Sequence, residues 1–223
     1  MGAVIGDILP LALGVMISPI PIIAAILMLL SPKAKGTSVG FLLGWVAGIV
    51  VVLTVFILLA SVIPQSDADQ PQPVAGVIKI VLGALMLLLA VKQWRSRPKP
   101  GEEAALPTWM SAIDQLTLAK CLGLGFLLSA VNPKNLLMAA GAGVVIGSAQ
   151  LATGELVVAV TVFTVIAAAS VAVPVIGYLL ASQALTGPLE SLRGWLVQNN
   201  ATVMSVLLLV IGVTSIGKGL GSF

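Results

Sequence analysis

Two short breaks, each built around proline, interrupt two long hydrophobic runs, one in each half of the chain. Proline lacks the backbone N–H and moves the residue before it out of the α region, so a helix ends at each break. Serine and asparagine are favoured helix N-caps, and proline is favoured at the first helical position. A new half-helix is therefore predicted to start at each break, whose residues are Ser18, Pro19 and Pro21 in the first and Asn132, Pro133 and Lys134 in the second.

The composition places these runs in a membrane. Of 223 residues, 59% are hydrophobic and 9% are charged, whereas soluble domains carry about a quarter charged residues. The first run has no basic leader and is about a full span long, so we expect it to be retained as a span and not cleaved as a signal peptide.

The reactive side chains exclude several classes of protein. A single cysteine, Cys121, permits no intramolecular disulfide, and there is no histidine to bind a transition metal. No acid/base pair or nucleophile constellation stands in the apolar runs, so we expect no enzyme activity, no metal and no cofactor. Basic residues cluster in loops that flank the membrane, which argues against nucleic acid as a partner.

Six apolar stretches are long enough to cross a bilayer: 3–31, 37–63, 74–92, 119–147, 153–182 and 200–219. An odd number of crossings separates equivalent positions of the two halves, which predicts an inverted repeat. The expected fold is an all-α polytopic membrane protein of six transmembrane helices in two inverted three-helix repeats, with helices 1 and 4 broken. Its parts are a first repeat (1–93), a cytoplasmic loop with an amphipathic stretch from Trp109 to Lys120 (94–118), and a second repeat (119–223).

Charged residues predict the orientation. Lys33, Lys35, five basic residues of the central segment and Arg193 all fall in loops on one side, and Lys218 is the only basic residue on the other. The positive-inside rule then places both termini outside the cytoplasm. All four tryptophans are expected at the cytoplasmic interface: Trp45, Trp94, Trp109 and Trp195.

The two breaks predict a binding site. Half-helices that start inside a membrane present free N–H groups and partial positive charge, and Lys134 adds a full charge beside one of them. Such a site favours an anion. Lys79, inside the outer edge of the third run, is either a second cation of this site or an interfacial residue that reaches toward water. The alternative for the breaks themselves is a pair of ordinary transmembrane kinks.

Two further features have simple alternatives. Gly36, Gly40, Gly44 and Gly48 recur every four residues and line one face of the second run, which favours tight helix packing over a sliding surface or a dimer contact. Two acidic groups near the outer ends of spans are candidates for proton coupling, although interfacial solvation explains them as well: Asp7 and Glu155.

These residues bring a family into view. The chain resembles the LysE (lysine exporter) superfamily and, within it, the GAP or Sap group of glycolipid-addressing proteins. The resemblance rests on the segment 18–33, the Gly-rich opening 40–45 of the second run, and Asn132 to Asn135 in the fourth. It covers essentially the full length. It implies an inner-membrane exporter of three-plus-three inverted repeats and, for the Sap group, movement of complex glycolipids toward the cell envelope.

The residue inventory separates this chain from other members of that superfamily. A thiol-electron transporter needs paired membrane cysteines, and a divalent-metal exporter needs intramembrane carboxylates or histidines; this sequence has neither. A lysine exporter also wants an acidic group at its site, whereas the breaks offer Lys134. Lysine export is therefore disfavoured despite the superfamily name.

The leading hypothesis is a transporter that exports or flips a lipid with an anionic head group by alternating access. The alternatives are an exporter of a small organic anion or amino-acid-like metabolite, and a non-transporting scaffold of a lipid-export complex. The predicted partners are membrane lipids, a second copy of the chain in a homodimer, and envelope proteins for lipid export or synthesis. The substrate is assigned to Ser18, Pro19, Pro21, Asn132, Pro133, Lys134, Asn135 and Lys79.

Overall fold

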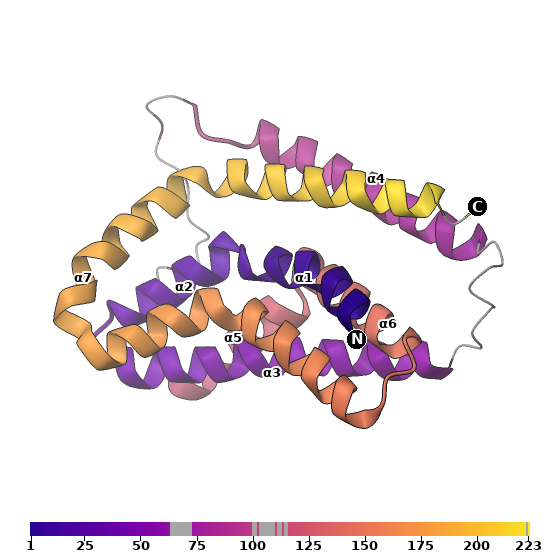
Figure 1. Ribbon diagram of the computed structural model, residues 1–223. Coiled ribbons are helices and arrows are strands. Elements are labelled where there is room, and N and C mark those ends of the chain that lie inside the picture. The colour runs from indigo at the N-terminus through magenta and orange to yellow at the C-terminus, as the bar shows by residue number, and fades with distance from the viewer. Residues whose placement is uncertain (63–72, 100–101, 103–109, 111–112, 114–115, 222) are drawn as a thin grey trace. The chain divides into compact units, whose positions relative to one another are not determined.

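The computed structural model is built of helices and describes residues 1–62, 73–99, 102, 110, 113, 116–221 and 223. Within these residues there is no β-strand. Figure 1 shows the helices in chain order: α1 (Gly2–Met16), α2 (Pro19–Leu29), α3 (Ala34–Val62), α4 (Pro73–Arg95), α5 (Leu118–Ala130), α6 (Pro133–Ser148) and α7 (Thr153–Leu220).

Both predicted breaks are confirmed. The helix axis bends by 51° between α1 and α2 and by 66° between α5 and α6. Ser18 and Asn132 occupy the N-cap positions of α2 and α6 with extended backbone angles, and each is followed by a proline at the first helical position. The local rules for helix ends thus placed both breaks at the right residue.

Three single helices are long and apolar enough to cross a membrane, or up to five segments if each bent pair is one span. They are Ala34–Val62, Thr153–Ser182 and Ala184–Leu220, with the pairs α1/α2 and α5/α6. The remaining expected span, the third in chain order (74–92), coincides with α4 but is not among these segments. Six crossings therefore remain a prediction. Five of the twelve residues of the amphipathic stretch from Trp109 to Lys120 lie outside the described residues, and its last three residues begin α5.

The expectation of a loop between residues 182 and 200 is wrong. Helix α7 has a kink at Ala181, where φ is −144° and ψ is 54°, and the helical stretch continues through this segment to Leu220. Pro174 and Pro188 lie within the helical stretch. Good helix formers such as leucine, glutamate and arginine between 184 and 199 continue the helix. The polar and charged residues of this segment had suggested a loop.

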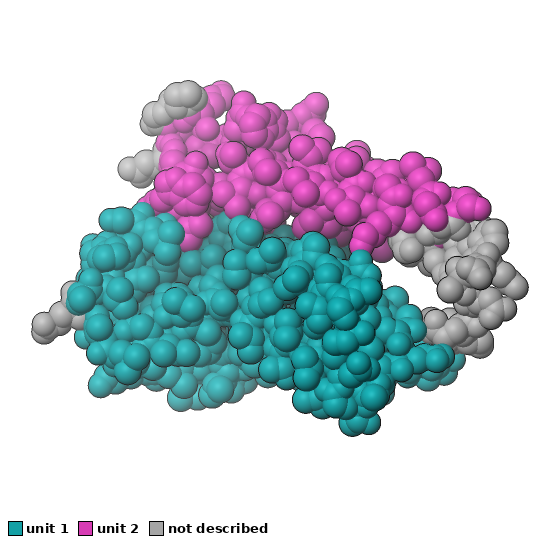
Figure 2. Space-filling model, in the orientation of Figure 1, with its two compact units in different colours: residues 1–63, 106–193 teal, residues 64–105, 194–223 magenta. Residues whose placement is uncertain are grey.

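The chain divides into two compact units, which Figure 2 shows in different colours. Unit 1 holds residues 1–63 and 106–193, and unit 2 holds residues 64–105 and 194–223. Each unit therefore takes segments from both halves of the chain. In unit 1 this joins the two broken helices, α3 and the first part of α7; in unit 2 it joins α4 to the last part of α7.

Helix α3 is central to the packing of unit 1, where it contacts α2, α5 and α6. A Cβ atom at Gly40 would lie 2.7 Å from the carbonyl oxygen of Leu118, and one at Gly44 or Gly48 would also overlap atoms of α5. Gly36 has open space around it. The glycine row thus serves tight helix packing at three of its four positions, the interpretation that the sequence favoured.

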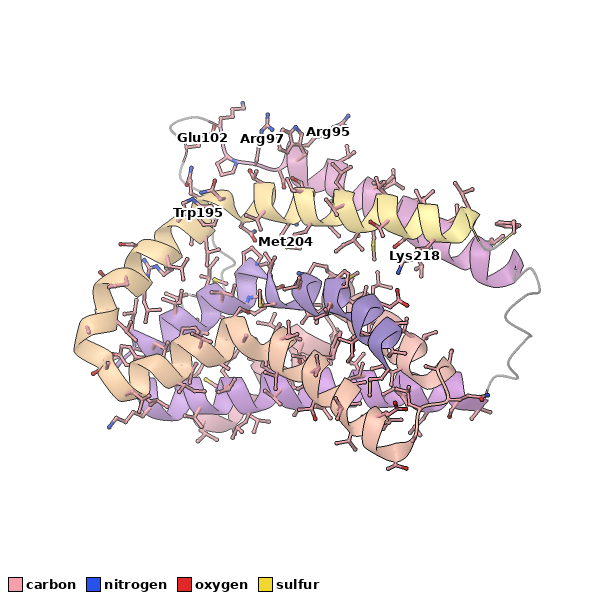
Figure 3. The ribbon with its side chains drawn as sticks, in the orientation of Figure 1. Arg95, Arg97, Glu102, Trp195, Met204 and Lys218 are labelled. Atoms are coloured by element: carbon pink, nitrogen blue, oxygen red, sulfur yellow. The ribbon has the colours of Figure 1, made fainter. Side chains whose placement is uncertain are left out.

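The tryptophans divide between the core and the surface. Trp45 is fully buried in unit 1 and stacks on Phe41, with 6.5 Å between ring centroids, so the expected interfacial position is wrong for this residue. Trp94 and Trp195 are exposed. Figure 3 shows Trp195 at the same end of unit 2 as Arg95 and Arg97. Trp109 lies outside the described residues.

Unit 2 is held together by a seam of small residues, which we call the glycine seam. A Cβ atom at Gly83 would lie 2.7 Å from the carbonyl oxygen of Gly212, and one at Gly219 would lie 2.8 Å from that of Gly76. Ala90, seven residues after Gly83, and Ser205, seven residues before Gly212, are both buried. The seven-residue spacing on both helices keeps small residues opposed in an antiparallel pair, which lets the backbones approach closely. The seam consists of Gly76, Gly83, Ala90, Ser205, Gly212 and Gly219.

The glycine row yields a matched pair of variants. Gly44→Ala should lower the free energy of unfolding of the detergent-solubilised protein by about 1–3 kcal/mol, because the added methyl group overlaps the α5 backbone. Gly36→Ala meets no atom within 4 Å and should leave the thermal midpoint unchanged or raise it. Equal midpoints for the two variants would contradict the packing of α3 on α5.

Candidate functional site

The first break leaves backbone carbonyls at the end of α1 without their α-helical partners, among them those of Gly14 and of the C-cap residue Ile17. The carbonyl of Gly14 would normally accept from the N–H of Ser18, but that N–H donates to Met16 at 2.9 Å. The carbonyl of Ile17 would accept from residue 21, which is proline and has no N–H. In a membrane interior such groups need another donor, because no bulk water replaces the lost hydrogen bond.

Lys134 supplies that donor from the other broken helix. Its Nζ donates to the carbonyl oxygen of Gly14 and, at 3.0 Å, to that of Ile17. The lysine side chain is 4% exposed. A cation at a helix C-terminus also interacts favourably with the negative end of the helix dipole. The ammonium group therefore replaces the backbone N–H groups that the first break removes from α1.

The second break is closed by asparagines. Asn132 caps α6 through its Oδ1, which accepts from the backbone N–H of Lys134 at 3.1 Å. The Nδ2 of Asn135 donates to the carbonyl of Leu128 in the last turn of α5 at 3.0 Å. Ser18 makes no side-chain cap bond, and its hydroxyl donates to Oδ1 of Asn135 at 3.4 Å.

These contacts bring the two breaks together in unit 1, in a group of residues that we call the break cluster. Ser18 and Asn135 are almost fully buried, whereas Asn132 is partly exposed. The sequence placed Lys134 beside a helix N-terminus, and the structure adds that its ammonium group faces the carbonyl end of α1. The cluster consists of Ser18, Asn132, Lys134 and Asn135 with the carbonyls of Gly14, Ile17 and Leu128.

The other sequence-predicted site residues have different surroundings. Pro19 and Pro21 are buried in the first turn of α2, and Pro133 is exposed at the start of α6. Asp7 in α1 and Glu155 in α7 are exposed and lie outside the break cluster. The backbone of Lys79 belongs to α4, but its side chain lies outside the described residues. No group of three or more potential metal ligands gathers within the part of the chain that the structure describes.

Sequence reasoning missed the backbone half of the site. The carbonyls of Gly14, Ile17 and Leu128 are backbone groups, so the residue type does not mark them as binding groups. The sequence also does not show which helix end the Lys134 side chain reaches. One signal was available for Ile17, because a proline four residues later removes its donor. No comparable signal marks Gly14.

The class that emerges is an apolar helical membrane protein with two broken helices joined at their breaks. A family model described as Sap, sulfolipid-1-addressing protein, matches residues 8–221. The chain belongs to this family, a lipid-related group of membrane proteins. No curated protein and no solved structure matches the chain.

Removing the lysine donor tests the break cluster directly. Lys134→Met keeps much of the side-chain volume but leaves the buried carbonyl of Gly14 and the part-buried carbonyl of Ile17 without this donor, so it should lower the free energy of unfolding by about 2–4 kcal/mol. Lys120→Met, at an exposed position near the start of α5, is the matched control and should change it by less than about 0.5 kcal/mol. Similar thermal unfolding midpoints for the two purified variants would contradict a stabilising role of the Lys134 hydrogen bonds.

Proposed function

We propose that this protein exports or flips a lipid with an anionic head group across the cytoplasmic membrane. The observation that carries the proposal is the meeting of the two proline breaks, joined by Lys134 and by the Ser18–Asn135 hydrogen bond. In transporters built of inverted repeats, the substrate site lies where discontinuous helices meet near the bilayer midplane. The family description, which names a sulfolipid, supports an amphiphilic and acidic cargo.

The chemistry of the break cluster supports an anion. A lysine ammonium has three N–H donors, and the carbonyls of Gly14 and Ile17 take two of them. The third donor and the start of α2 after Ser18 are then offered to an oxygen of a sulfate, phosphate or carboxylate. Asn132, which is partly exposed at the start of α6, adds an amide group beside them.

The same contacts couple the two proposed repeats. Lys134 and Asn135 belong to the second half, while Gly14, Ile17 and Ser18 belong to the first. Rocking of one half against the other must rearrange these hydrogen bonds, so a bound head group that competes for them shifts the balance between inward-open and outward-open states. Asp7 and Glu155 remain candidates for the coupling proton, and a homodimer and envelope proteins remain the proposed partners.

Transport of labelled lipids tests the proposal. Wild-type protein in liposomes should move a sulfated or phosphorylated lipid between leaflets at least about tenfold faster than a neutral lipid, because only the anion pairs with Lys134. Lys134→Met, selected for folded protein by gel filtration, should lose this preference, and Lys120→Met should keep it.

Other outcomes favour the alternatives. Movement of a labelled soluble amino acid without movement of any lipid would replace lipid transport with metabolite export. Movement of neither cargo by folded wild-type protein would favour the scaffold, for which the Lys134→Met variant should retain binding to its envelope partners. Equal rates for anionic and neutral lipids would contradict the anionic specificity.

The proposed orientation has its own test. Arg95 and Arg97 lie at one end of unit 2 and Lys218 toward the other, as Figure 3 shows, and the positive-inside rule places the arginine end in the cytoplasm. In a Cys121→Ser background, Phe223→Cys should react with a membrane-impermeant maleimide in intact cells. Ser96→Cys should react only after permeabilisation, and the reverse pattern would invert the topology.

A further inference from the structure

A cavity of about 580 Å³ lies in unit 1, away from the residues of the break cluster. One wall is the connection between α2 and α3 together with the first turn of α3, and the other is α7 just before and after its distortion at Ala181. The lining residues are Ser31, Pro32, Lys33, Ala34, Lys35, Gly36, Tyr178, Leu179 and Ser182. We call it the lysine cavity.

Among the residues that the structure describes, the lining of the lysine cavity is rich in donors and includes no acidic side chain. Lys33 and Lys35 are cationic, and Tyr178 and Ser182 each contribute a hydroxyl group. Local hydrogen bonds occupy several acceptors of this turn. The carbonyl of Lys33 accepts from the hydroxyl of Thr37 at 3.0 Å, and the carbonyl of Ser31 accepts from the N–H of Ala34 at 3.1 Å. The groups that remain available in the lining are thus mostly hydrogen-bond donors and positive charges.

The start of α3 strengthens this bias. Ala34, Lys35 and Gly36 are in its first turn, where the positive end of the helix dipole lies. The N–H groups of Ala34 and Gly36 donate to the carbonyls of Ser31 and Lys33, each at 3.1 Å, so the dipole is the main contribution of this turn. A helix N-terminus alone is common, but here it opens into a cavity that also contains two lysines and the Tyr178 hydroxyl from a separate helix. Tyr178 is half-buried and lines the cavity from α7, whereas both lysines come from the segment between α2 and the first turn of α3.

From these observations we propose that the lysine cavity binds the oxyanion of an anionic amphiphile, a phosphate or sulfate group, as a second site on this protein. The volume exceeds what a single oxyanion needs and leaves room for part of the attached head group. Lys33 and Lys35 bind the charge, the positive end of the α3 dipole favours it, and Tyr178 donates from α7.

The position of the cavity relates it to the break cluster. Helix α2 begins directly after Ser18 and ends at Leu29, two residues before Ser31 of the cavity. Its 11 residues span roughly 16 Å at about 1.5 Å per residue. The two anion sites thus lie at the two ends of one half-helix. This step rests on the proposed function, and under it the lysine cavity loads the head group on the predicted cytoplasmic side before transfer to the break cluster.

Direct binding to the full-length protein tests the inference without any transport step. The protein is placed in nanodiscs of phosphatidylcholine and titrated by calorimetry with three probes: dihexanoyl phosphatidic acid, dihexanoyl phosphatidylcholine and inorganic phosphate. The double variant Lys33→Gln/Lys35→Gln should raise the Kd for the phosphatidic acid at least about tenfold. Tyr178→Phe, which leaves the net charge unchanged, should raise it by about threefold or more.

The matched control is the double variant Lys92→Gln/Lys120→Gln, which removes two charges at exposed positions outside the cavity and should change the Kd less than about twofold. Binding of phosphatidic acid with weak binding of inorganic phosphate assigns the site to a lipid head group. Equal binding of both assigns it to the free oxyanion.

Two results overturn the inference: equal weakening by both double variants, or an unchanged Kd in both the Lys33→Gln/Lys35→Gln and Tyr178→Phe proteins. Binding at the cavity by a protein that moves no lipid would contradict the proposed transport and leave the oxyanion site in place. The two failures are therefore distinguishable, because one is measured as a dissociation constant and the other as a rate of transbilayer movement.

Discussion

A proline inside a membrane helix removes a hydrogen-bond donor where water cannot replace it, and the structure depends on how that loss is compensated. At the first break the compensating donor is the Lys134 ammonium, which reaches the carbonyls of Gly14 and Ile17. At the second break it is the amide of Asn135, which reaches Leu128. Because the donor at the first break starts from α6, the repair of that break also joins the two broken helices.

Close packing of backbones gives this arrangement its rigid surroundings. Lipid tails offer no hydrophobic driving force between helices, so van der Waals contact must hold them together, and small residues allow it. Gly40, Gly44 and Gly48 bring α3 against α5, while Gly83 and Gly212 bring α4 against the end of α7. The glycines that are packed in this way cannot also serve as a dimer surface, which removes one use of the row that the sequence left open.

Local chemistry predicted much of this fold, and tertiary contacts decided the rest. Proline and cap rules predicted both breaks to the residue, because they depend only on neighbours in the chain. The burial of Trp45 was missed because an aromatic side chain suits an interface and a helix core equally well. The helix across 183–199 was missed because its polarity suggested a loop. The partners of Lys134 were missed because they are backbone carbonyls, which every residue has and which a sequence therefore does not distinguish.

The placement of Lys134 bears on how charge is balanced at the breaks. In transporters with broken helices, the carbonyls freed at the C-terminal ends of half-helices coordinate a coupling cation. Here an ammonium group that is covalently part of α6 occupies the carbonyls of Gly14 and Ile17. A soluble cation can bind there only by displacing it. Under the proposed transport, Lys134 is a positive charge built into the protein, so an anionic head group bound beside it needs no co-transported metal ion.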